Sequence, residues 1–474
     1  MLAAPRAGAS VMMGSRLTRL ENVPPTRQFW TNPSVLSLAG DRDPVDVITE
    51  RAREVVLGAI EEGWRGPPYD PFELAQLMNV PAVPREDLYD ARLMPAEGGK
   101  VRLEFNPTRP RGRVRFTIAH ELAHTFFPDY KKAARYRSGP KSRSDEWQLE
   151  LLCNVAAAEL LMPIGSFQTL EDEPLKIERL MDIRKRFEVS TEALLLRIVR
   201  LTARPSAAFA AARVDGDGPD SPFRLDYVIG SRNWSSKLHR GLRIPATSVL
   251  AEITAVGFTA KRRESWNGAG EVGVECVGIP PYPGQRLPRV VGLLLAQEAA
   301  PAAQEITDLV GDATVPRGEG PRLIVHLVND KTANWGGPFA RALKARYPAA
   351  QAVFAEWARE TGNLKLGNVH LVDVGDDIAV ATMVAQKGYG ASAKTRVRFA
   401  ALREALERVA AIAQERNATV HMPRIGTGEG KADWPIIREL IDTALVWAGI
   451  DVSVYTLPGT PLQEPAEAQL ALRT

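Results

Sequence analysis

Apolar and polar positions in the N-terminal part of the chain predict a strand followed by a helix. Residues 100–105 alternate between the two kinds of side chain and end at Asn106-Pro107, which is typical of a β-strand. A basic turn over 109–115 follows, and helical spacing runs from Phe116 to Pro128. We expect the strand to form a sheet edge above this helix, where an extended peptide could pair with it.

Helical patterns continue for the next stretch and then give way to strands. Residues 146–163 predict a helix ended by proline, and residues 174–201 predict two helices. Their charges do not gather on one face, so we expect this pair to pack against the preceding helices rather than to read DNA. After Ala203-Arg204-Pro205 the pattern becomes short alternating segments, which predict an α+β or β-rich domain. These segments are 225–229, 273–278 and 290–295.

The C-terminal part contains two strand–glycine loop–helix units. The first joins a buried-type strand at 323–329 to the loop 334–339, and a helix over 340–347 follows. The second joins a strand at 420–425 to the loop 426–430, with a helix beginning near Asp433. Backbone N–H groups of such loops can approach an anion, and ligands gather at the carboxyl ends of strands in α/β sheets. This pattern predicts a phosphate-binding α/β/α fold.

Composition fits a multidomain globular protein and argues against a nucleic-acid-binding or a membrane-spanning protein. The chain has 474 residues, 45% hydrophobic and 25% charged, with a net charge of +3 and two cysteines. The charge is too small to indicate a nucleic-acid-binding surface, and no apolar run is long enough to span a membrane. Two cysteines suit a cytoplasmic protein. The expected divisions are a disordered tail at 1–35, domains at 36–203, 204–300 and 303–460, and a tail at 461–474.

The segment His120-Glu121-Leu122-Ala123-His124 has the spacing of a hydrolytic zinc site. Positions i and i+4 lie on one helix face, so both imidazoles can reach one Zn²⁺, and Glu121 can take a proton from a water molecule. The next helix offers Glu150 as the third ligand, with Glu146 as the alternative, and Asn154 as a partner for a ligand histidine.

Residues from about 48 to 165 resemble the ImmA/IrrE family of zinc metallopeptidases. The matching segments are 63–64, 67–71, 105–107, 115–121, 153–154 and 160–163. The resemblance implies an α+β zincin-like fold with His120, His124 and Glu150 as zinc ligands and Glu121 as general base. It also implies cleavage of a repressor or partner protein in stress responses or mobile-element control. Tyr136 or Arg137 could stabilise an oxyanion, although an ordinary exposed loop explains them better. A sensing domain, sometimes GAF-like, often follows in this family.

Residues from about 305 to 457 resemble a macrodomain, the ADP-ribose-binding fold, in the branch of terminal ADP-ribose glycohydrolases and ADP-ribose phosphate phosphatases. The matching segments are 311–314, 324–329, 336–340, 347–348, 366–367, 385–387, 422–428 and Trp434. The resemblance implies Asp312 at the adenine amine, Asn329 near the distal ribose, and the two glycine loops around the diphosphate. The expected loop residues are Trp335, Gly336, Gly337, Phe339, Gly426, Thr427, Gly428, Glu429 and Gly430.

Hydrolysis of ADP-ribose esters in this branch pairs a lysine with an aspartate in the second loop. Lys387 is a candidate lysine, but Gly430 stands where the aspartate is expected, with Glu429 one residue earlier. We therefore expect ADP-ribose binding ahead of hydrolysis. The predicted function is a regulatory zinc endopeptidase linked to ADP-ribose or to an ADP-ribosylated protein. The alternatives are an ADP-ribosyl hydrolase with an accessory peptidase domain, and a non-catalytic interaction protein.

Overall fold

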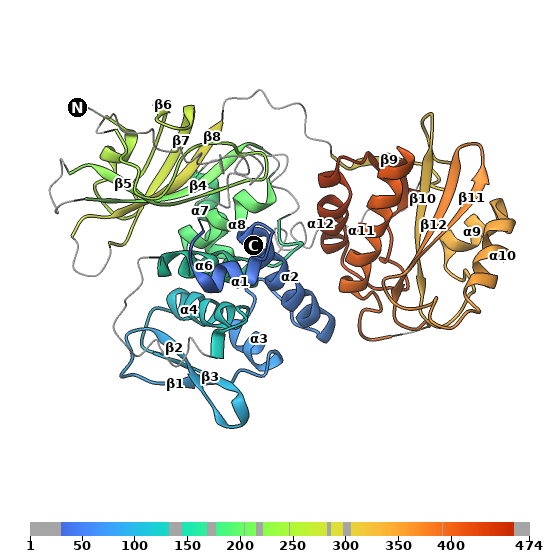
Figure 1. The fold of residues 1–474 in the computed structure, drawn as a ribbon, viewed down its shortest axis with the longest axis horizontal. Coiled ribbons are helices and arrows are strands. Elements are labelled where there is room, and N and C mark those ends of the chain that lie inside the picture. Colours follow the sequence, from blue (N-terminus) through green and yellow to red (C-terminus); the bar gives the residue numbers. More distant parts are fainter. Residues whose placement is uncertain are drawn as a thin grey trace, which may run out of the picture.

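The computed structural model describes residues 30–131, 145–167, 177–202, 204–214, 221–245, 247–281, 286–296, 305–390 and 392–458. Its elements form a mainly helical part with a small sheet, a middle antiparallel sheet, and a mixed sheet between helices (Figure 1). The predicted multidomain α+β and α/β architecture is confirmed. Residues 1–29 and 459–474, most of the two expected tails, lie outside the described residues, but a helix already begins at Pro33, inside the first.

The N-terminal part builds seven helices around one three-stranded sheet in the described residues. The helices are α1 (Pro33–Ala39), α2 (Pro44–Glu62), α3 (Pro71–Leu77), α4 (Arg111–His124), α6 (Glu146–Leu161), α7 (Ile177–Phe187) and α8 (Thr191–Leu201). The strands are β1 (Ala82–Pro84), β2 (Ala91–Pro95) and β3 (Val101–Phe105). Helix α2 starts where the Asp43 side chain accepts a hydrogen bond from Val45 N, and it ends at Gly63, whose φ is +109°.

Two expectations for this part are wrong. Helix α4 begins at Arg111, so the basic segment expected as a turn forms its first turns, and it ends at His124. Strand β3 lies in the centre of its sheet, since β1 pairs with it in parallel and β2 antiparallel. The free edges are therefore β1 and β2, and β2 packs on α4 together with β3.

The middle part is a five-stranded antiparallel sheet in the order β5-β4-β8-β7-β6. Its strands are β4 (Ser206–Arg213), β5 (Phe223–Gly230), β6 (Thr259–Trp266), β7 (Gly270–Ile279) and β8 (Arg289–Ala296). Helix α8 packs on α6 and on β4 and β8, so the predicted packing role of this helix is confirmed. The GAF-like character of the sheet stays a prediction.

The C-terminal part is a six-stranded sheet in the order β11-β12-β10-β13-β14-β9, parallel except for β11. Its strands are β9 (Thr307–Val310), β10 (Arg322–Asn329), β11 (Val369–Gly375), β12 (Ile378–Gln386), β13 (Thr419–Pro423) and β14 (Val452–Thr456). Its helices are α9 (Pro338–Arg346), α10 (Pro348–Trp357), α11 (Phe399–Arg416) and α12 (Trp434–Ala444). Helices α11 and α12 lie on the side of the sheet toward the N-terminal part, and α9 and α10 lie on the far side (Figure 1).

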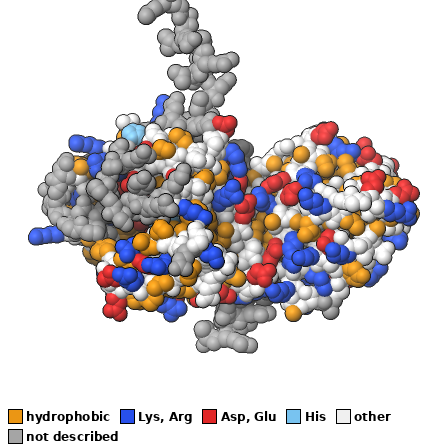
Figure 2. Space-filling model, turned by 60° about the horizontal axis from the view of Figure 1, so that its bottom comes forward, with side chains coloured by type: hydrophobic (Ala, Val, Ile, Leu, Met, Phe, Trp, Pro, Cys, Tyr) orange, Lys and Arg blue, Asp and Glu red, His pale blue; other side chains and the backbone are white. Residues whose placement is uncertain are grey.

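The N-terminal and C-terminal parts pack directly on each other. One hydrophobic cluster runs through both, from Val35 to Val454, and α2 contacts α11. Polar contacts cross the same boundary: Arg403 pairs with Glu54 at 3.1 Å. Figure 2 shows charged side chains of both signs along the seam between the two lobes. No helix within the described residues is long and apolar enough to cross a membrane.

Candidate functional site

Helices α4 and α6 bring the predicted metal ligands together. The Nε2 atoms of His120 and His124 lie 3.1 Å apart. Glu150 on α6 places one carboxylate oxygen 3.1 Å from His120 Nε2 and the other 3.9 Å from His124 Nε2. A tetrahedral zinc site with bonds of 2.0–2.1 Å has ligand atoms about 3.3 Å apart. The spacing of these donor atoms therefore fits one small metal ion held by two imidazoles and a carboxylate.

Other donors near the histidines fit a metal less well as the third ligand. Cys153 belongs to a cluster with both histidines that could hold a metal, but its Sγ lies 3.1 Å from His124 Nδ1, the ring nitrogen opposite Nε2. An ion shared by the two Nε2 atoms would lie on the Glu150 side of the ring. The contacts among the described residues also join Glu150, and not Glu146, to the histidines. Glu150 is therefore the better third ligand.

The Nδ1 atoms of His120 and His124, on the far side of each ring from Nε2, contact side chains of α6. Asn154 Oδ1 lies 2.8 Å from His120 Nδ1, so the amide oxygen can accept the N–H and leave Nε2 free to bind a metal. Cys153 holds the corresponding nitrogen of His124. Burial lowers the pKa of His120, but the Glu150 carboxylate, with Glu121 and Asn154, raises it more, so the net pKa lies above its ordinary value. This negative environment also favours a cation.

Glu121 lies beside the predicted zinc ligands. The Glu121 side chain is buried on α4 and its charge acts on His120. A buried carboxylate next to a metal site is suited to take a proton from water. Tyr136 and Arg137 lie outside the described residues.

The C-terminal sheet carries a cavity of about 510 Å³ at the carboxyl ends of β13 and β14. Four predicted ligand residues line it, namely Asp312, Phe339, Thr427 and Gly428. The sequence reasoning missed three polar lining residues, Arg424, Tyr455 and Thr456. The guanidinium of Arg424 lies 4.9 Å from the ring centroid of Trp434, and burial lowers its pKa. Arg424 could have been found, since only Ile425 separates it from the second glycine loop.

The other residues predicted at or before the first loop, Asn329, Trp335, Gly336 and Gly337, lie outside the cavity lining. Asn329 Oδ1 accepts hydrogen bonds from the backbone N–H of Lys331 and Thr332, both at 2.9 Å, so it shapes the start of the loop. Trp335 is buried against His326, with ring centroids 4.5 Å apart, and belongs to the core. Gly336 and Gly337 have no atom within 4 Å of an added Cβ, which leaves open space before the start of α9.

The second loop has no room for a side chain at Gly430. A Cβ there would lie 2.5 Å from the Gly426 carbonyl oxygen and 2.8 Å from Val397 Cγ2. The aspartate expected in hydrolytic relatives is therefore excluded by the backbone, and Glu429 is exposed. Lys387 is exposed as well, and after Lys394 it is one of the cations that lower the pKa of Glu62 on α2. It lies toward the N-terminal part and is not among the residues that line the cavity.

Comparison with known proteins finds a family match for one segment of the chain and several similar proteins. Residues 86–199 match the family model of the IrrE N-terminal-like domain, Peptidase_M78. This region is an IrrE-like peptidase domain. The match of the IrrE-like domain spans α4 and α6, and so includes the histidines and Glu150.

Solved structures similar to part of the chain include macrodomains. A macrodomain protein from Streptomyces coelicolor is 37% identical, with 32% of this chain and 99% of that chain covered and a TM-score of 0.29. The macrodomain of Mycobacterium tuberculosis DarG is 26% identical, with 33% and 98% covered and a TM-score of 0.26. The chain thus contains a segment that matches the IrrE-like domain, and about a third of its length is similar to solved macrodomains.

A curated relative is the chromodomain-helicase-DNA-binding protein 1-like of Mus musculus, 32% identical over 173 residues, which are 34% of this chain. The chain spans only 19% of that relative and 15% of its Danio rerio counterpart.

Proposed function

We propose that this protein is a zinc-dependent endopeptidase of regulatory type, whose targeting or activity is linked to ADP-ribose, or to an ADP-ribosylated protein, bound by its macrodomain. The observation that carries the proposal is the convergence of His120, His124 and Glu150 within ligand spacing, with Glu121 beside them. The match of this region to the IrrE-like peptidases supports the same reaction class.

In the proposed reaction His120, His124 and Glu150 would hold Zn²⁺, which supplies Lewis-acid activation of water at neutral pH. Glu121 accepts a proton from the attacking water and passes it to the leaving amine. Asn154 keeps the Nδ1 proton of His120 and thereby fixes its tautomer. Strand β2 lies at an edge of its sheet and packs on α4. It is therefore the strand best suited to align an extended substrate peptide.

The macrodomain part of the proposal is binding rather than hydrolysis. Asp312 and the second glycine loop line a cavity that could take a nucleotide-sized ligand. The backbone around Gly430 leaves no space for the aspartate that ester hydrolysis needs in related domains. The hydrolase alternative therefore has no observation in its favour.

A Glu121→Gln variant of the full chain tests the peptidase. Glutamine keeps the shape of the side chain but cannot accept the proton, so zinc should be retained and cleavage should stop. Zinc content is measured by atomic absorption. The variant, with and without ADP-ribosylation in the cell, is then used to capture uncleaved substrate. Retained proteolysis in a zinc-loaded Glu121→Gln protein would show that Glu121 is not the base.

A further inference from the structure

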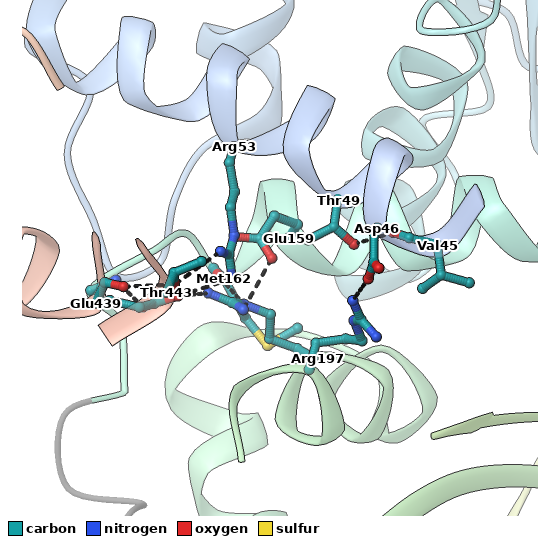
Figure 3. A network of polar contacts seen from close by, with 11 residues as sticks. Val45, Asp46, Thr49, Arg53, Glu159, Met162, Arg197, Glu439 and Thr443 are labelled. Carbon is teal, nitrogen blue, oxygen red and sulfur yellow. Dashed lines mark hydrogen bonds and ion pairs between the residues drawn. The ribbon is translucent and has the colours of Figure 1, made fainter. Parts of the chain in front are cut away.

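Four charged side chains form a buried cluster where the peptidase domain meets the macrodomain (Figure 3). Arg53 of α2 lies 3.2 Å from Glu159 of α6 and 3.3 Å from Glu439 of α12. Arg197 of α8 lies 3.0 Å from Glu159 and 3.1 Å from Glu439. The side chains of Arg197 and Glu159 are 1% and 2% exposed, so water screens these charges very little.

Glu439 is the only member of this cluster that comes from the macrodomain. Its second carboxylate oxygen accepts a hydrogen bond from Gly165 N at 2.6 Å, three residues beyond the C-cap of α6 at Met162. Without Glu439, two buried arginines would share the single carboxylate of Glu159. An uncompensated buried charge is strongly unfavourable. The macrodomain therefore supplies the charge that lets three peptidase helices pack together at this point.

The cluster acts on the helix that carries the zinc ligand. Glu159 and Glu150 belong to the same uninterrupted helix, α6, about 13 Å apart along its axis at 1.5 Å per residue. A packed helix moves as a unit, so a shift of Glu159 would also move Glu150 and Asn154. Gly165, which follows α6, also packs closely against α12, because an added Cβ would lie 2.7 Å from Ile436 Cγ1.

The other face of α12 supports the ligand cavity. Its first residue, Trp434, stacks with Arg424, which lines the cavity. One turn later, Ile437 Cδ1 lies 2.9 Å from the Cβ position of Gly426, the first residue of the second glycine loop. Helix α12 thus contacts the cavity wall on one side and the peptidase arginines on the other.

We propose that Glu439 is a positioning residue of the zinc site, and that α12 is the element through which the macrodomain cavity and the zinc site affect each other. The second part rests on the proposed function, because it takes ADP-ribose as the ligand of the cavity. The first part concerns only the peptidase and stands without any ligand.

The first experiment measures metal binding in full-length variants. Glu439→Gln should raise the Kd for Zn²⁺, measured by competition with a chelating dye, about tenfold, at the low end of the effect of removing a partner that orients a ligand. It should also change the visible absorption of the Co²⁺-loaded protein, which reports ligand geometry. The control is Glu54→Gln, which removes an exposed ion pair across the same boundary and should leave both readouts unchanged.

A second variant separates positioning from loss of folding. Arg53→Met combined with Glu439→Gln leaves Arg197 paired with Glu159, so the cluster is neutral again and zinc affinity should return to within about threefold of wild type. Unchanged zinc affinity and cobalt absorption in Glu439→Gln would overturn the positioning role. So would a folded double variant that binds zinc as weakly as Glu439→Gln.

The coupling is tested by calorimetry with ADP-ribose on zinc-loaded and chelator-treated protein. Wild type should show Kd values that differ about fivefold or more between the two forms, and Glu439→Gln should show one value. Equal Kd values in wild type would overturn the coupling and leave the ADP-ribose assignment intact. Absence of ADP-ribose binding to either form would overturn both that assignment and the coupling, while the zinc measurements decide the role of Glu439 by themselves.

Discussion

Substitution of Gly336 by glutamate tests the proposal that the first glycine loop holds the diphosphate of ADP-ribose. An added Cβ at Gly336 meets no atom within 4 Å, and its φ is not in the left-handed region, so the variant should fold like wild type. If the loop carries the diphosphate, the new carboxylate would lie close to two phosphate charges. At an effective dielectric constant of about 20, two unit charges about 4 Å apart repel by about 4 kcal/mol.

Because Gly336 is exposed, solvent and salt reduce this repulsion to about half, or about 2 kcal/mol. The Kd for ADP-ribose should therefore rise about thirtyfold in calorimetry at low salt. Gly336→Gln is the matched control, since it adds the same bulk without the charge and should lose much less affinity. Equal affinities of wild type and Gly336→Glu would refute the placement of the diphosphate at this loop. Equal losses in both variants would show that bulk alone blocks the site.

Two further perturbations have clear expected outcomes. Asn154→Ala removes the side chain that accepts the hydrogen bond from the His120 ring. Zinc binding, measured by competition with a chelator, should become about 10-fold to 100-fold weaker. An unchanged zinc affinity would argue that packing alone orients the ring. Burial lowers the pKa of His326 from 6.5 to about 3, so its contribution to stability is complete above about pH 6.5 and is lost as the pH falls toward 3. Between pH 7 and pH 4.5 the titration of His326 alone should lower the stability by about 3 kcal/mol, at about 1.4 kcal/mol per pH unit below pH 6.5, as followed by hydrogen exchange of β10. A His326→Gln variant should lose less, and identical pH profiles would contradict the buried neutral histidine.

Local patterns predicted that His120, His124 and Glu150 come together, because these residues lie close together in sequence. The separation of His120 and His124 by one helical turn needs no long-range information, and Glu150 follows on the next helix. The start of α4 was harder to predict. Its first turns are rich in arginine and contain Gly112, a composition typical of a turn, but Arg111 and Arg115 pair with Glu188, which is distant in sequence.

Strand β4 shows a different limit of sequence patterns. Five of its eight residues, Ser206 to Arg213, are alanine, a helix-favouring residue, and nearly every position is buried. Alanine occurs there because β4 lies inside the sheet between β5 and β8, with α8 packed against it. Only the tertiary arrangement explains the choice.

The buried charge cluster had no signal in the sequence at all. Arg53 and Glu439 are separated by 386 positions, and each resembles an ordinary charged residue on an amphipathic helix. The same holds for Trp335, which the glycine-loop pattern suggested as a ligand contact but which the fold buries beside His326. Long-range pairing and burial are set by topology, which local spacing does not encode.

The hydrophobic cluster that runs from Val35 to Val454 limits how this protein could have been assembled and how it can be divided. A cut between residues 296 and 305 would expose the apolar faces that α2 and α11 now bury against each other. Either fragment would expose an apolar surface and would therefore tend to aggregate. Separating the two parts into stable units would therefore require polar residues along the whole seam.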